Sequence, residues 1–255
     1  MRKSLLLIFC LSALWISAQR PAAITDVEVG IVEHLGDTIP LDLRFVNEKG
    51  DTVALRQLID KPTVLSFVYF DCPGLCSPLL DGVSDVIEKS DLELGKDYKV
   101  ITISFNYRDT PEKAREKKKN FLRRHSKSRS DNWTYLTTDS ATIFRITDAA
   151  GFKVKSVGFD FIHPSAIIIT SPAGKITRYL YGVTFLPFDF KMAIGEAQKG
   201  IAQPSINRVL EFCFSYDPQG RRYTLEVTRV AGIVIIFIFL VTILVLFITR
   251  RKQKK

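Results

Sequence analysis

The chain has 255 residues, four cysteines, 46% hydrophobic residues and a formal net charge of +9. A disulfide-rich scaffold is excluded, because a chain of this length can bury its own core and the three cysteines beyond the N-terminal segment cannot all pair with one another. Seven positive charges lie at the chain ends, at Arg2, at Lys3 and in residues 250–255, so the basic balance indicates membrane orientation rather than nucleic-acid binding.

Apolar segments at both ends predict where the protein lies in the cell. Residues 1–18 have a basic start, an apolar stretch and small residues at Ser17 and Ala18, the pattern of a secretory signal peptide, which would remove Cys10. Residues 230–249 carry no charge and match the length of a membrane-spanning helix, and the basic tail after them should stay cytoplasmic. We therefore expect a single-pass protein of the cytoplasmic membrane with its globular domain on the periplasmic side.

Strands and helices are predicted to alternate between these ends. In chain order we expect strands at Leu41–Asn47 and Thr52–Leu55, a core strand in residues 61–70, a helix starting near Cys76, a second core strand at Tyr98–Phe105, a basic helix in residues 111–125, a helix in residues 139–151, a hairpin of Ser165–Thr170 with Lys175–Tyr181, and a final helix in residues 187–200. This order, with two cysteines at the first strand-to-helix corner, is that of a thioredoxin-like α/β domain.

The predicted fold class is therefore α/β, a thioredoxin-like fold with a C-terminal transmembrane helix. The expected segments are a signal peptide (1–18), an N-terminal segment (19–36), the thioredoxin-like domain (37–203), a C-terminal extension (204–229), the transmembrane helix (230–249) and a basic cytoplasmic tail (250–255). The basic helix of residues 111–125 is interpreted as a solvated face, with docking to an acidic partner or to anionic lipid as the alternative.

The stretch TVLSFVYFDCPGLCSPLL, residues 63–80, carries the reactive groups. Cys72 and Cys76 are four positions apart, about one helical turn, so their sulfurs can face the same way if the segment is helical. A helix N-terminus favours thiolate over thiol, which would activate the pair. A structural disulfide is the weakest interpretation, because so small a loop removes little entropy from the unfolded chain. Spacing alone leaves disulfide exchange and metal binding open.

The three histidines help to decide between these two activities. His163 directly precedes a core strand, and in a thioredoxin-like layout its loop lies beside the cysteine corner. His125 lies in a cationic segment, and His34 is expected at the surface unless its early loop folds back. Two thiolates and an imidazole suit copper, as Cu(I) or Cu(II). Structural zinc normally takes a fourth ligand, and an iron–sulfur cluster needs more cysteines.

Four segments in order resemble the Sco/SenC family of copper chaperones in cytochrome c oxidase assembly: DCPGLC, ISFNYRDTPEKA, FIHPSAIIITSPAGKITRYLYG and EFCFSYDPQGRRY. The resemblance covers roughly residues 29–217. It implies a thioredoxin fold and one copper ion held by Cys72, Cys76 and His163. It also implies oxidase subunit II as the partner, whose CuA site would receive copper or have its cysteines reduced. The sequence departs from common family residues at Phe70, Gly74, Ser77 and Ile162.

The expected function is that of a membrane-anchored, extracytoplasmic copper chaperone. The main alternative is a thiol-disulfide oxidoreductase in which Cys72 attacks and Cys76 resolves, with metal binding incidental. A copper-responsive signalling protein using the same site is a third interpretation. Cys213 lies among aromatic residues and is interpreted as a small buried hydrophobe.

Overall fold

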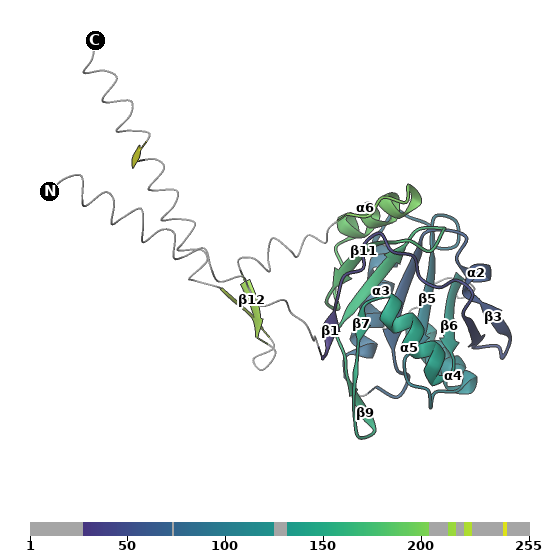
Figure 1. The fold of residues 1–255 in the computed structure, drawn as a ribbon. Coiled ribbons are helices and arrows are strands. Elements are labelled where there is room, and N and C mark those ends of the chain that lie inside the picture. Colours follow the sequence, from purple (N-terminus) through teal and green to yellow (C-terminus); the bar gives the residue numbers. More distant parts are fainter. Residues whose placement is uncertain are drawn as a thin grey trace, which may run out of the picture.

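The computed structural model describes residues 28–72, 74–124, 132–203, 214–217, 222–225 and 242–243 (Figure 1). The expected signal peptide, His125, Cys213 and nearly all of the expected membrane segment lie outside these residues. Within the described part of the chain, no helix combines the length and the apolarity that crossing a membrane requires.

A seven-stranded sheet, ordered β11-β10-β4-β5-β6-β2-β3, forms the centre of the domain. Its strands in chain order are β2 (Arg44–Asn47), β3 (Thr52–Ala54), β4 (Thr63–Val68), β5 (Lys99–Ser104), β6 (Trp133–Thr137), β10 (Ala166–Thr170) and β11 (Ile176–Tyr181). β4, β5 and β6 are parallel, whereas β10 runs antiparallel to both β4 and β11. The order β11-β10-β4-β5, with a parallel pair followed by an antiparallel hairpin, confirms the predicted thioredoxin-like fold.

Helices cover both faces of this sheet. They are α2 (Leu55–Leu58), α3 (Cys76–Lys89), α4 (Pro111–Arg124), α5 (Ser140–Ala149) and α6 (Pro187–Gln198). The crossovers β4-α3-β5 and β5-α4-β6 advance in the same direction across the sheet, so right-handed connections place α3 and α4 on one face. α6 packs against α3, β10 and β11, and α5 packs against β7 (Phe152–Lys153).

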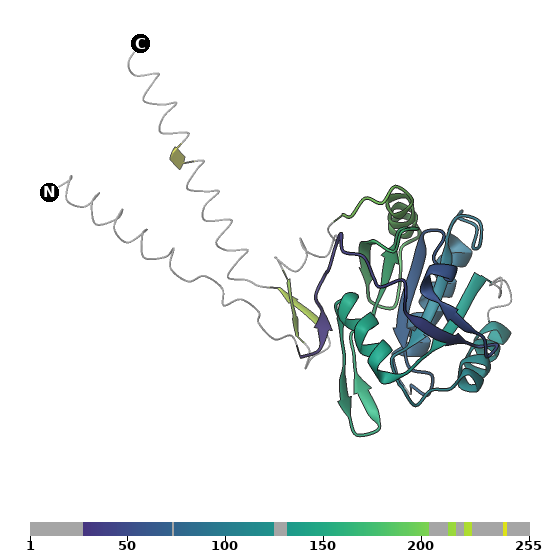
Figure 2. The ribbon, with the colours of Figure 1, turned by 45° about the vertical axis from the view of Figure 1, so that its right-hand side comes forward.

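Short strand pairs complete the described chain. β1 (Gly30–Ile31) pairs with β7, β8 (Lys155–Val157) pairs with β9 (Asp160–Ile162), and β12 (Phe214–Asp217) pairs with β13 (Arg222–Leu225). Figures 1 and 2 both show the β8–β9 hairpin projecting from the edge of the domain. This hairpin leads directly into His163, so it positions one of the predicted ligands.

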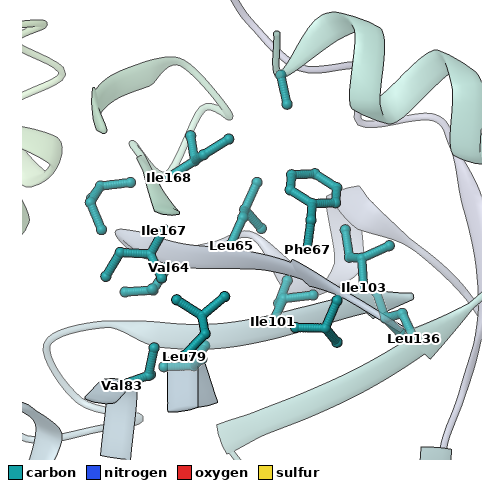
Figure 3. Close-up of a cluster of buried hydrophobic side chains, with 14 of the residues drawn as sticks. Val64, Leu65, Phe67, Leu79, Val83, Ile101, Ile103, Leu136, Ile167 and Ile168 are labelled. Atoms are coloured by element: carbon teal, nitrogen blue, oxygen red, sulfur yellow. The ribbon is translucent and has the colours of Figure 1, made fainter. Parts of the chain in front are cut away.

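The core explains why β4 is held rigidly. All six residues of β4 are buried, as predicted for a central strand covered on both faces. Figure 3 shows Leu79 and Val83 of α3 on one side of β4 and Phe67 on the other. On that second side, the ring of Phe67 lies 5.0 Å from the ring of Phe152 in β7. β4 therefore delivers the chain into the cysteine loop from a fixed position.

Most of the predicted elements are confirmed, and their bounds shift by a few residues. β2 begins at Arg44 rather than Leu41, because residues 41 and 42 form a turn. The β10–β11 hairpin, α5 and α6 lie where the sequence predicted them. β6 and the β8–β9 hairpin were not predicted, and β6 forms the third parallel strand.

Candidate metal centre

Cys72, Cys76 and His163 meet beyond the carboxyl end of β4. Cys72 lies in the turn after β4, Cys76 is the first residue of α3, and His163 follows β9. The two sulfurs and a ring nitrogen of His163 all lie within 4.8 Å of one another. Both cysteines are free thiols. The described residues contain no other group of three histidine, cysteine or acidic side chains arranged to hold a metal ion.

The helix predicted to start near Cys76 is confirmed, and Cys72 lies in the turn before it. α3 begins at Cys76, and the Cys72 N–H donates to the carbonyl oxygen of Tyr69 (3.3 Å), which turns the chain before the helix starts. A spacing of four residues brings side chains together on a helix, but a turn that leads into a helix brings them together as well. The expectation of a cysteine at a helix N-terminus is confirmed for Cys76.

The imidazole of His163 is oriented by its own backbone neighbour. Nδ1 lies 2.9 Å from the carbonyl oxygen of Pro164, and Nε2 lies 3.8 Å from Sγ of Cys76. Because a carbonyl oxygen only accepts hydrogen bonds, Nδ1 carries the proton and Nε2 presents its lone pair toward the thiols. The ring also packs against Tyr69 and Phe105, with centroids 6.1 and 5.2 Å away. The ligand atom is therefore in place before any metal binds.

The two thiols differ in charge state. A hydrogen bond from the Cys76 side chain lowers the pKa of the half-buried Cys72 thiol well below its ordinary value, although burial opposes the shift. The same pairing with Cys72, together with burial, raises the pKa of Cys76. One proton is thus shared unequally, with Cys72 as the thiolate and Cys76 as the donor.

This asymmetry predicts a pH-dependent order of alkylation. Iodoacetamide should label Cys72 before Cys76. Labelling should persist near pH 6, because a lowered pKa keeps the thiolate populated at a pH where an ordinary cysteine, with a pKa of about 8.5, is protonated. Rates measured on the reduced full-length protein, with mass-spectrometric assignment of the labelled residue, test this order.

The matched variant is Cys76→Ala, which removes the hydrogen-bond donor. Its Cys72 profile should move toward that of an ordinary thiol. Equal labelling of both cysteines at about pH 6 in the unaltered protein would contradict the assignment of the proton to Cys76.

A buried carboxylate supports the cysteine loop. Oδ2 of Asp109 accepts hydrogen bonds from the Phe70 N–H (2.8 Å) and from the Ser104 hydroxyl (2.6 Å), which ties the ends of β4 and β5 together. Asp109 stands two residues before Pro111, the first residue of α4. The hydroxyl of Thr110 caps α4 by accepting from the Lys113 N–H (3.4 Å). Asp109 therefore fixes the start of the cysteine loop at Phe70 relative to the end of β5 at Ser104.

Aromatic side chains from distant segments surround His163, and sequence reasoning missed them. Tyr69 lies 5.6 Å from Phe105 and 5.3 Å from Phe161 between ring centroids, and its hydroxyl donates to Asp160 (3.3 Å). The clusters FVYF before the first cysteine and FDFIH around the histidine were the available signal. Sequence alone did not show that these clusters contact each other.

The remaining histidine that the structure describes lies apart from this centre. The N–H of His34 donates to the hydroxyl of Tyr179 (3.0 Å), and its Nδ1 lies 3.1 Å from the carbonyl oxygen of Ala149. His34 is half-buried, so its loop does fold back onto the domain, and its contacts are those of a packing residue.

The donor set fits a soft metal ion. Metal–ligand bonds of about 2.0–2.3 Å place two donor atoms roughly 3.5–4.5 Å apart around one ion. Sγ of Cys76 and Nε2 of His163 already lie 3.8 Å apart. Two sulfurs and one imidazole nitrogen favour copper, since low-coordinate Cu(I) is satisfied by few soft ligands.

Comparisons with known proteins identify chains with similar sequences. The family model described as SCO1/SenC matches residues 34–185. The SCO1 protein homolog of Bacillus subtilis (strain 168) is 29% identical over 149 residues, which cover 57% of this chain and 75% of that protein.

Solved structures share the fold. A candidate electron transfer protein of Aquifex aeolicus VF5 has a TM-score of 0.59 and 31% identity, covering 65% of this chain and 95% of that one. Arabidopsis thaliana ScoI, solved with copper bound, has a TM-score of 0.53 and 19% identity, covering 65% of this chain and 99% of that one.

Proposed function

Since the chain belongs to the SCO1/SenC family, we propose that it binds copper through Cys72, Cys76 and His163 and serves cytochrome c oxidase assembly outside the cytoplasm. The observation that carries this proposal is the convergence of two thiols and one imidazole within 4.8 Å. Such a set is soft and three-coordinate at most, which suits an ion that is to be handed on rather than kept.

Copper would leave this site by ligand exchange. Cys72 is half-buried and Cys76 is buried, so an incoming thiolate reaches the metal from the side of Cys72. The acceptor we propose is the CuA site of oxidase subunit II, as the family resemblance implies. The signal peptide and the charge-free segment of residues 230–249 support a location at the outer face of the cytoplasmic membrane.

Thiol–disulfide exchange is the second candidate, and the unequal sharing of one proton favours it. A thiolate at Cys72 can attack a disulfide, and Cys76 can then resolve the mixed disulfide. The same two sulfurs serve both activities, so copper delivery and reduction of the acceptor's cysteines are alternative uses of one site.

Titration of the reduced full-length protein with Cu(I), against a competing chelator, tests the copper proposal. We expect one ion per chain and loss of tight binding once Cys72 and Cys76 are oxidised to a disulfide, because the disulfide sulfurs are poor ligands. Weak binding that does not change on oxidation would refute copper binding at this site and leave thiol exchange as the function.

A further inference from the structure

An arginine in contact with two exposed aromatic rings joins two segments that lead to the metal centre. The guanidinium carbon of Arg108 lies 5.3 Å from the ring centroid of Tyr107 and 5.4 Å from that of Phe159. Phe159 is 89% exposed at the tip of the β8–β9 hairpin, and Tyr107 is 57% exposed after β5. The ring of Phe105, two residues before Tyr107, contacts His163. The arginine therefore connects two segments that both lead to the ligands.

Arg108 presents its charge to solvent. Its Nε lies 3.4 Å from the hydroxyl of Tyr107, and the ion pairs found among the described side chains do not include it. Contact with two rings restricts the motion of a guanidinium, which reduces the entropy lost when it binds a carboxylate through two hydrogen bonds. Such a group is preorganised for an acidic ligand.

The basic helix α4 adds a second cation on the side of the cysteines. Nζ of Lys117 donates to the hydroxyl of Ser77, the residue after Cys76 (3.2 Å). Asp71 pairs with Lys113, whereas Asp160 accepts only from the neutral hydroxyl of Tyr69 and keeps its charge. Neither Arg108 nor Lys117 belongs to an ion pair found among the described side chains, so both are cations that an incoming acidic group can pair with.

Exposed aliphatic side chains stand directly next to the ligands. Leu75, which precedes Cys76, is 49% exposed, and Ile162, which precedes His163, is 54% exposed. Aromatic residues and arginine around an apolar centre are the residue types that carry most of the binding energy in protein interfaces. Cations and apolar side chains also suit a lipid surface, but their position next to the metal-binding thiols favours a partner that exchanges with those thiols.

We propose that Leu75, Tyr107, Arg108, Lys117, Phe159 and Ile162 form a docking rim for an acidic protein loop that carries the thiols with which the site exchanges. The proposal rests on the proposed function, and it names the charge of the partner and the residues that recognise it. Arg108 and Lys117 attract the loop, and the apolar residues of the rim exclude water from the exchanging sulfurs.

Three peptides with one central cysteine can test the docking rim without metal. Each carries acidic, serine or lysine residues around the cysteine, which is activated as a mixed disulfide with thionitrobenzoate. The Cys72 thiolate attacks the peptide sulfur, a Cys72–peptide disulfide forms and thionitrobenzoate leaves. Cys76 then loses its proton and displaces the peptide thiolate, so the protein pair is oxidised by two electrons and the peptide disulfide is reduced.

The measured quantity is the rate of thionitrobenzoate release from the reduced full-length protein in a non-ionic detergent. We expect the acidic peptide to react about tenfold faster than the lysine peptide at low ionic strength, with an advantage that salt removes. Arg108→Gln and Lys117→Gln should each reduce the ratio of the acidic to the serine rate about threefold. Dividing the acidic-peptide rate by the serine-peptide rate cancels any change that a substitution makes in the intrinsic reactivity of Cys72.

Lys89→Gln is the matched control, because Lys89 is an exposed lysine in the last turn of α3 and pairs with Asp85. It should leave all three rates unchanged. No preference for the acidic peptide, or a preference that survives in the Arg108→Gln, Lys117→Gln double variant, would overturn the docking rim.

Vesicles provide the second arm of the test. If the double variant loses binding to phosphatidylglycerol vesicles while the unaltered protein shows no peptide preference, the cations serve lipid and the proposal is wrong. Because the peptide assay contains no copper, a failure of copper binding would leave its outcome untouched. The two proposals can therefore fail separately.

Discussion

Replacing His163 with alanine should weaken Cu(I) binding by about a hundredfold or more while largely sparing disulfide exchange. The imidazole contributes one of three donors, and its Nε2 is held 3.8 Å from Sγ of Cys76 by the contact between Nδ1 and Pro164. Loss of a preorganised ligand costs at least as much as the 10–100-fold effect of losing a residue that merely orients one. The two sulfurs remain, so the exchange reaction keeps both of its reactants.

The experiment compares Cu(I) affinity by chelator competition with the rate of disulfide exchange in the same preparation. His34→Gln is the control histidine, since His34 packs between Tyr179 and Ala149 and lies outside the ligand group. Thermal unfolding of both variants shows whether either has lost its fold. An unchanged affinity in His163→Ala would mean that the site does not use three ligands.

The sequence predicted the site because its signals were local. Cys72 and Cys76 are close in the chain, and His163 stands directly before a strand whose position follows from the thioredoxin-like order. The helix predicted to start near Cys76 was confirmed. The turn that holds Cys72 could not be predicted, because a four-residue spacing is compatible with a helix and with a turn that enters one.

The parts that escaped prediction depend on long-range contacts. The β8–β9 strands have three residues each, and only Phe161 is partly buried, so no alternating pattern marks them. The role of Asp109 depends on Phe70, 39 positions away in the chain. An acidic residue shortly before a proline predicts a helix start in many contexts. Only the tertiary structure shows that the Asp109 side chain points into the domain, toward Phe70.

The second large effect is expected on stability, from substitution of Gly82, whose close packing fixes the position of α3 and so of Cys76. A Cβ added at Gly82 would lie 1.9 Å from the carbonyl oxygen of Val183 and 3.6 Å from the ring of Phe185. The residue is buried in the middle of α3, so the helix backbone itself packs against the segment that follows β11. Gly82→Ala must therefore displace the helix or that segment.

We expect Gly82→Ala to lower the free energy of unfolding by about 2–4 kcal/mol, because backbone overlap outweighs the gain of about 1 kcal/mol from the higher helix propensity of alanine. Gly195→Ala in α6 is the matched control, since a Cβ there meets nothing within 4 Å. It should stabilise the protein by about 0.5–1 kcal/mol. Urea unfolding followed by far-ultraviolet circular dichroism measures both changes.

The Gly82 variant also connects packing with the metal centre. α3 carries Cys76 at its first residue, and Sγ of Cys76 lies 3.8 Å from the imidazole of His163, which belongs to a different segment. A displaced α3 changes this separation, so the folded fraction of Gly82→Ala should bind Cu(I) more weakly than Gly195→Ala does. Equal stability of the two variants would show that α3 tolerates displacement. The precise placement of Cys76 would then depend on the cysteine loop and its Asp109 support alone.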